Sequence, residues 1–174
     1  TDSSKRAPKT RLASAALIRE ALMKAKNYHT LWKLSEADPS RKAPKFDMKL
    51  HSLMRVFDGM PVKITAKRSH DMTTAIRIAE EFELNYILED YTESWLITDI
   101  LKKHQLNCVV GPSYGQKSNA SRYRDPIVGS VLAEHGITFA SSTANPRMNI
   151  EMAEHNLTPM SKTGLTAKAA PESD

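Results

Sequence analysis

Short apolar runs alternate with longer segments of helical periodicity from Pro61 onward, and this alternation constrains the fold more than any other feature. The runs recur at intervals of 22–29 residues. Such a pattern is typical of an α/β fold, in which parallel strands are joined by helical crossovers. Each run is continuously apolar, as expected when helices cover one face and a core fills the other. The predicted strands cover residues 62–64, 86–88, 108–110 and 137–140.

A helix is expected after each strand, which makes about four strand–helix repeats. The first helix opens at Asp71, the second is capped by Thr92, the third covers 127–135, and a loosely helical segment covers 148–168. A polar loop is expected over 113–126. Four repeats are half of an eight-fold TIM-type barrel, which needs about 250 residues. A four-stranded open α/β sheet is the alternative.

The first third of the chain is expected to hold two helices and no strand. Apolar residues at three- and four-residue spacing predict helices over 10–34 and 47–57, and Gly59 is expected to end the second. Residues 35–46, with two prolines among charges, are predicted to be a linker. The expected domains are a flexible basic arm over 1–9, a helical insertion over 10–59 and a half barrel over 60–174.

Positive charge is concentrated in the same third. The whole chain carries a formal charge of +5, but residues 1–49 hold 12 basic and 5 acidic side chains. This segment could contact an RNA or an acidic protein partner through phosphates or carboxylates. Only Tyr28 and Trp32 interleave with the basic residues, so a solvated basic arm is the favoured interpretation.

The single cysteine and the lack of long apolar stretches indicate the cellular compartment in which the protein is expected. Cys108 lies inside an apolar run and is expected to be a small buried hydrophobic residue. One cysteine forms no internal disulfide, which indicates a reducing compartment. The longest uncharged apolar stretches are far shorter than the roughly 20 residues that span a bilayer. We therefore expect an intracellular protein, of the cytoplasm or an organelle matrix, with no membrane partner.

Several motifs, in one order along the chain, resemble the amidohydrolase superfamily, and most closely its imidazolonepropionase-like and related metal-dependent members. The resemblance begins with a helix like that at residues 10–21, which such proteins carry ahead of the fifth strand. The motifs that carry it are Pro61–Met72, Ala75–Phe82, Leu88–Glu93, Val109–Pro112 and Gly136–Pro146.

The resemblance implies the carboxyl-terminal half of a metal-dependent eight-fold barrel. Members of the family hydrolyse C–N bonds in cyclic amides, imides or peptides, and one or two divalent metals at the strand ends activate a water. The family has His-Ala-His at the end of the fifth strand, where this chain has Thr65-Ala66-Lys67. It has Glu-His after the sixth, where this chain has Glu89-Asp90, and Thr-Asp-His-Pro at the eighth, where this chain has Thr143-Ala144-Asn145-Pro146.

Each position that matches a family metal ligand is therefore substituted, namely Thr65, Lys67, Asp90 and Ala144. Thr65 is at best a weak neutral ligand, and Ala144 removes the carboxylate that would serve as general base. Lys67 places a cation where the metal would lie. Asp90 could still coordinate, but one carboxylate does not hold a zinc ion. We expect no metal and no other cofactor, although the relatives use zinc or another divalent metal.

Acidic and basic side chains follow neighbouring predicted strands. Glu89, Asp90 and Glu93 follow one strand, and Lys67 and Arg68 follow the strand before it. Because the ends of adjacent parallel strands lie close together, these groups could form a polar site with perturbed pKa values. The favoured interpretation is an ion pair between Lys67 and Asp90 that fills the space of the metal.

Candidate catalytic residues are correspondingly weak. They are Asp90, Glu89, Lys67 and His70, the last of which lies just past the first predicted strand. For His70 the favoured interpretation is a helix N-terminus capped by Asp71. The serines lack the Gly-x-Ser-x-Gly turn of a nucleophile elbow.

Three functions remain open from the sequence. The first is an amidohydrolase-like domain without a metal site, non-catalytic, that serves as a structural or interaction subunit. The second is a metal-dependent hydrolase of C–N bonds whose ligands come from another segment or chain. The third is a basic binding module in a larger, RNA-containing assembly. A half barrel has two open sheet edges, so we expect self-association or a partner chain that completes the barrel, unless the two preceding helices fold over the open face.

Overall fold

The computed structural model describes residues 10–111, 125 and 127–142, and it has the α/β fold that the sequence predicts. Four strands form one sheet in the order β1-β2-β3-β4, as expected for part of a TIM-type barrel. No helix in these residues is long and apolar enough to cross a membrane. The arm at 1–9, most of the loop at 113–126 and the helical segment at 148–168 lie outside the described residues.

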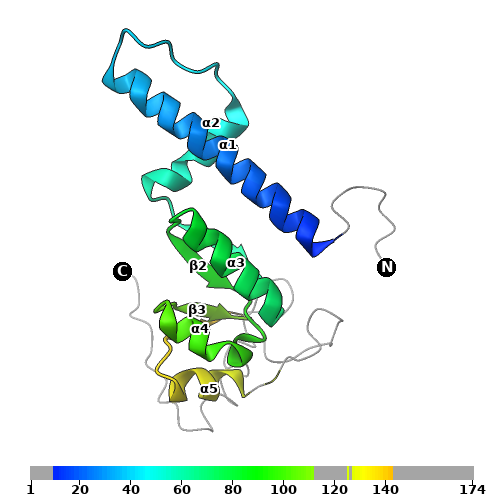
Figure 1. Cartoon of the computed structure of the whole chain (residues 1–174). Helices are drawn as coiled ribbons and strands as arrows, with labels where there is room; N and C mark the ends of the chain where they lie inside the picture. The colour runs from blue at the N-terminus through cyan, green and yellow to red at the C-terminus, as the bar shows by residue number, and fades with distance from the viewer. Residues whose placement is uncertain (1–9, 112–124, 126, 143–174) are drawn as a thin grey trace. The chain divides into compact units, whose positions relative to one another are not determined.

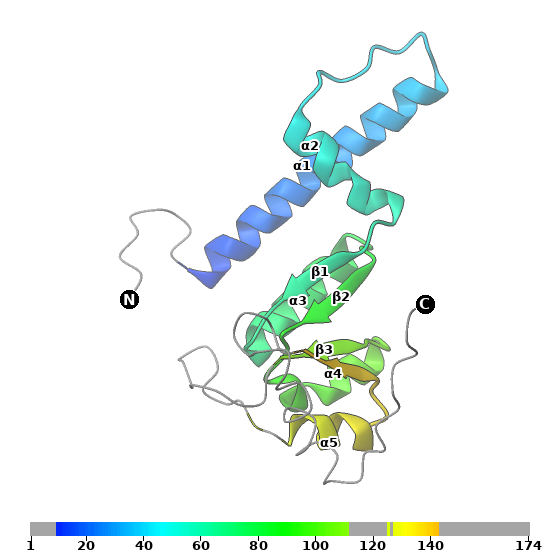
Figure 2. The same ribbon diagram turned by 180° about the vertical axis from the view of Figure 1, so that it is seen from behind.

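Figures 1 and 2 show the elements α1 (Arg11–Ala37), α2 (Met48–Leu53), η1 (Met54–Asp58), β1 (Val62–Thr65), α3 (Ser69–Glu81), β2 (Tyr86–Glu89), η2 (Ser94–Leu96), α4 (Thr98–Lys103), β3 (Cys108–Val110), α5 (Val128–Glu134) and β4 (Phe139–Ser141).

The chain divides into two compact units. The described residues of Thr1–Val62 and Thr74–Tyr86 form the first, and those of Lys63–Thr73 and Ile87–Asp174 form the second. The first unit therefore joins segments from both sides of residue 60. The domain boundaries that the sequence suggests at residues 9 and 59 stay a prediction.

The first unit is built on α1. Thr10 caps this helix, because its hydroxyl oxygen accepts a hydrogen bond from the Ala13 N–H at 3.1 Å. The helix has 27 residues, a length of about 40 Å. Side chains of one face are buried against η1 and α3, where Ala15, Leu22, Val56, Ile78 and Phe82 form a core.

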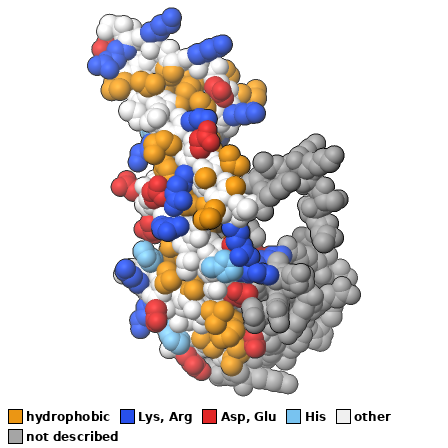
Figure 3. Space-filling model, turned by 45° about the vertical axis from the view of Figure 1, so that its right-hand side comes forward, with side chains coloured by type: hydrophobic (Ala, Val, Ile, Leu, Met, Phe, Trp, Pro, Cys, Tyr) orange, Lys and Arg blue, Asp and Glu red, His pale blue; other side chains and the backbone are white. Residues whose placement is uncertain are grey.

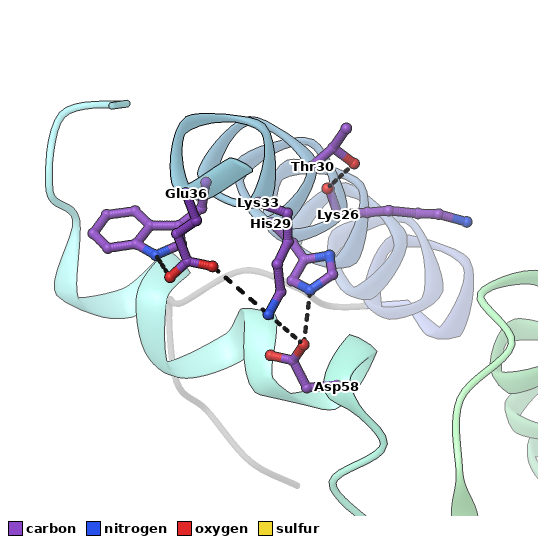
Figure 4. A network of polar contacts seen from close by, with 7 residues as sticks. Lys26, His29, Thr30, Lys33, Glu36 and Asp58 are labelled. Carbon is purple, nitrogen blue, oxygen red and sulfur yellow. Dashed lines mark hydrogen bonds and ion pairs between the residues drawn. The ribbon is translucent and has the colours of Figure 1, made fainter. Parts of the chain in front are cut away.

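A polar network fastens α1 to η1 (Figure 4). The Asp58 carboxylate lies 3.1 Å from His29 Nε2 and 3.2 Å from Lys33 Nζ, and both side chains come from α1. The Trp32 indole N–H donates to Glu36 at 3.0 Å. His29 therefore lies within α1 and contacts a carboxylate of η1.

The second unit contains the sheet and α4 and α5. Cα partners are Leu88 with Cys108 and Cys108 with Phe139, and both pairings are parallel. Leu88, Cys108 and Val110 are buried on one face. Sequential strand order with right-handed crossovers places the helices on that same face. The opposite face is more open.

Four helix boundaries differ from the sequence prediction. Helix α1 continues to Ala37, three residues into the predicted linker. The helix expected from Thr92 is instead a short 3-10 helix, η2, followed by α4, because the Thr92 hydroxyl donates to the Lys67 carbonyl at 3.0 Å and so caps no helix. Asp71 lies inside α3, which begins at Ser69. The second N-terminal helix breaks into α2 and η1 at Met54, and Gly59, with φ of 89°, ends it as predicted.

Candidate site at the carboxyl ends of β1 and β2

An ion pair joins the segments that follow β1 and β2. Lys67 Nζ lies 3.5 Å from Asp90 Oδ2, and the side chains are 25% and 6% exposed. The sequence predicted this pair, and the structure confirms it. The pair forms because strands β1 and β2 are parallel neighbours, with the Ala66 N–H donating to the Glu89 carbonyl at 3.3 Å. Two oppositely charged groups thus sit at one end of the sheet.

Asp90 is held over a glycine of the next strand. Its φ of 62° is left-handed, a conformation that aspartate tolerates better than most residues. A Cβ at Gly111 would lie 2.1 Å from Asp90 Oδ1, closer than atoms can approach. Gly111 therefore leaves the space that the Asp90 carboxylate occupies.

Two further hydrogen bonds fasten the same pair of segments. The Thr92 hydroxyl donates to the Lys67 carbonyl, and the buried Glu93 carboxylate accepts from the Ser69 N–H at 2.8 Å. Negative charge at the N-terminus of α3 also complements the helix dipole. The segment from Lys67 to Ser69 is consequently fixed at three points by residues 90–93.

Glu89 and Thr65 lie on the open face of the sheet. Glu89 Oε1 is 3.5 Å from Lys63 Nζ, and the Lys63 side chain is largely exposed. Thr65 is exposed. The Glu89 and Asp90 side chains therefore point in different directions. Glu89 pairs with Lys63, and Asp90 pairs with Lys67.

The remaining candidates lie apart from this pair or outside the described residues. His70 is in the first turn of α3, with its Nε2 atom 3.6 Å from Asp71 Oδ1. Asp71 is therefore a neighbour of His70 within the helix and not the predicted cap. Ala144 lies outside the described residues, so its place relative to Thr65 stays a prediction.

The described residues at this site do not form a ligand set for a divalent metal. A zinc site needs about four nitrogen, sulfur or oxygen ligands in tetrahedral geometry. Thr65 supplies a hydroxyl and Lys67 supplies an ammonium group, which is already paired with Asp90. Within the described residues, no group of three or more His, Cys, Asp or Glu side chains could hold a metal ion.

Two further titratable side chains, Cys108 in β3 and Tyr91 after β2, are buried. Cys108 is buried as predicted, and burial raises the pKa of its thiol to about 11. Burial, together with Cys108, also raises the pKa of Tyr91 above its ordinary value. Both groups stay neutral near pH 7, so neither adds a nucleophile to the site.

Sequence reasoning missed Gly111, Thr92 and the role of Glu93. Gly111 was visible only as the residue that follows a strand, one position beyond the residue level with Asp90. Only the register between the strands, which a single sequence does not reveal, shows that Gly111 and Asp90 are close together. Thr92 and Glu93 bond to backbone atoms 25 and 24 residues away, respectively, beyond the range of capping rules.

Comparison with known proteins supports the fold. No family model and no curated protein matches the chain. Among solved structures, the crystal structure of an amidohydrolase from Thermotoga maritima superposes with a TM-score of 0.85 at 27% sequence identity. The match covers 93% of this chain and 43% of the Thermotoga chain. The chain thus has an amidohydrolase-like fold and spans less than half the length of that neighbour.

Proposed function

We propose that this chain is a non-catalytic amidohydrolase-like domain that serves as a structural or interaction subunit. The observation that carries the proposal is the Lys67–Asp90 ion pair at the carboxyl ends of β1 and β2. Active sites of TIM-type barrels lie at these ends. Here the Lys67 ammonium group and the Asp90 carboxylate neutralise each other at the strand ends, and Gly111 leaves space for the carboxylate.

The same network connects the two strand ends, as shared metal ligands would. Hydrogen bonds from Thr92 and to Glu93 add two more connections. A buried carboxylate with a lysine partner contributes to stability only while both charges are present. This arrangement supports a structural role for the polar cluster.

Metal content tests the proposal directly. The purified 174-residue chain, dialysed against metal-free buffer, should hold less than about 0.1 zinc per chain, because Thr65, Lys67 and Asp90 form no tetrahedral ligand set. It should also release no product from cyclic amide or dipeptide substrates when zinc is added back. One zinc per chain retained through dialysis, with zinc-dependent hydrolysis, contradicts the proposal.

A basic binding function has less support. Several basic side chains of the first third pair with carboxylates: Arg19 with Glu81, Lys24 with Glu20, and Lys33 with Asp58. On the face shown in Figure 3, charges of both signs are interspersed with hydrophobic side chains. A nucleic-acid surface requires positive charge in excess along one face. We therefore do not propose RNA as the partner.

A further inference from the structure

We propose that α1 pairs in antiparallel orientation with α1 of a second copy of this chain, about a two-fold axis that passes beside Met23. The contact uses the outer face of α1, which is defined by the exposed residues Leu12, Leu17, Glu20, Met23, Leu31 and Leu34. This inference goes beyond the proposed function. It rests on α1 alone and does not depend on the catalytic state of the strand ends.

Helix α1, the long blue helix of Figures 1 and 2, carries apolar side chains on more than one face. Leu22 and Ala25 are buried within the first unit. At about 100° per residue, the outer face lies on the opposite side of the helix. It nevertheless carries large apolar side chains, because Leu12 is 84% exposed and Met23 is 50% exposed. A helix that is apolar all round is ordinarily covered all round.

The apolar positions on the outer face are self-complementary. Leu12 and Leu34 each lie 11 residues from Met23, close to three helical turns, so the three side chains form one row about 33 Å long. In an antiparallel pair centred on Met23, Leu12 lies level with Leu34 of the second copy, and Met23 meets Met23. A two-fold contact requires one surface that matches itself in this way.

A second row repeats the match on the other side of the same face. Leu17 and Leu31 lie roughly 100° around the helix from the first row. Their midpoint is residue 24, so the same axis brings Leu17 of one copy level with Leu31 of the other. Among the exposed large apolar residues of α1, which the structure describes completely, Ile18 is the one outside both rows.

The charges between the two rows favour the antiparallel orientation. Glu20 and Lys24 form an ion pair within α1, and both side chains are more than half exposed. In the antiparallel pair each Lys24 has its own Glu20 on one side along the axis and Glu20 of the second copy on the other, which makes a neutral network of four charges. In a parallel pair the two Glu20 carboxylates would lie level with each other. Complementary charge selects the orientation of a contact.

Cysteine cross-linking on the full chain tests the contact and its orientation. With a short bis-maleimide linker, Met23→Cys should form a covalent dimer, whereas Ile18→Cys, at the same 50% exposure, should not. A mixture of Leu12→Cys and Leu34→Cys chains should form the mixed dimer, and neither chain should cross-link with itself. Cys108 is buried, and the wild-type chain controls for its reaction.

Two cross-linking results overturn the proposal. The first is a Met23→Cys chain that cross-links no more than Ile18→Cys at 100 µM. The second is a Leu12→Cys chain that cross-links with itself and not with Leu34→Cys, because that result indicates a parallel pair.

Light scattering at 1–100 µM gives an independent readout on chains without added cysteine. The wild-type mass should rise from 19.5 kDa toward twice that value. Met23→Lys should raise the dissociation constant of the dimer at least tenfold, whereas Ile18→Lys should change it less than twofold. A monomer throughout, or a dimer that Met23→Lys leaves intact, overturns the proposal.

A charge exchange tests the network between the rows. Glu20→Lys should weaken the dimer at least fivefold, because it gathers positive charge at the axis. Adding Lys24→Glu to the same chain should restore the dissociation constant to within twofold of the wild-type value, since it forms the network again with the charges exchanged. A double variant as weak as Glu20→Lys alone overturns the proposed pairing.

Discussion

At the residue scale, the position of the Asp90 carboxylate depends on the missing side chain of Gly111. Asp90 has a left-handed backbone and a buried carboxylate, and Gly111 provides the space beside it. Lys67 then supplies the opposite charge. The ion pair was predictable from two strand ends that carry opposite charges. The glycine was not, because its partner lies in another strand and the contact depends on register.

Replacing Gly111 by alanine tests this dependence. The new Cβ would meet Asp90 Oδ1 at 2.1 Å, so the carboxylate must move away from Lys67, and we expect a loss of about 1–3 kcal/mol of unfolding free energy. In an Asp90→Gly background the obstructing carboxylate is gone and a left-handed residue is well tolerated. There the same Gly111→Ala change should cost at least 1 kcal/mol less, roughly the coupling expected for residues in contact.

Urea denaturation of the four proteins at pH 7 measures this coupling. Equal costs of Gly111→Ala in both backgrounds would show that the Asp90 carboxylate is not what the glycine accommodates.

At the element scale, strands follow from the sequence better than helix boundaries do. Apolar runs place β1, β2 and β3 within one residue of their observed bounds, since each strand needs apolar side chains on its buried face. The start of α3 at Ser69 could not be predicted, because the Glu93 carboxylate that holds its first N–H comes from a later segment. Thr92 failed as a cap for the same reason. Capping rules use residues that are close in sequence, whereas the hydrogen-bond partners here are close only in space.

The contact between α1 and η1 gives a pH-dependent prediction. The hydrogen bond from His29, and then that from Lys33, lowers the pKa of Asp58 below its ordinary value. A lowered pKa in the folded state contributes stability above the unfolded pKa, near 3.9, and that stability is lost as pH falls through the folded pKa. Asp58→Asn should therefore destabilise the protein at pH 7, and the difference from wild type should shrink below about pH 3.5.

Urea denaturation of both proteins at pH 7 and pH 3 measures this difference. Glu20→Gln is the matched control, since Glu20 pairs with Lys24 inside α1 and joins no second element. Its effect should be smaller at pH 7. An Asp58→Asn effect that is the same at both pH values would mean that the carboxylate charge does not hold α1 to η1.

At the scale of the whole molecule, an incomplete sheet and a stable fold must be reconciled. Single edge strands are common, but here both edges of a four-stranded parallel sheet and one of its faces lack cover among the described residues. Parallel sheets are ordinarily covered on both faces. The sequence led us to expect self-association, which predicts a link between chain concentration and stability.

Thermal unfolding measured across chain concentrations tests that link. A dimer that unfolds to two separate chains gains about 1.4 kcal/mol for each tenfold rise in concentration. Divided by the unfolding entropy of two 174-residue chains, this free energy should raise Tm by roughly 2 °C per tenfold rise in concentration. A wild-type Tm that is constant from 1 to 100 µM would mean that each chain is stable by itself, with its open face covered from within the same chain.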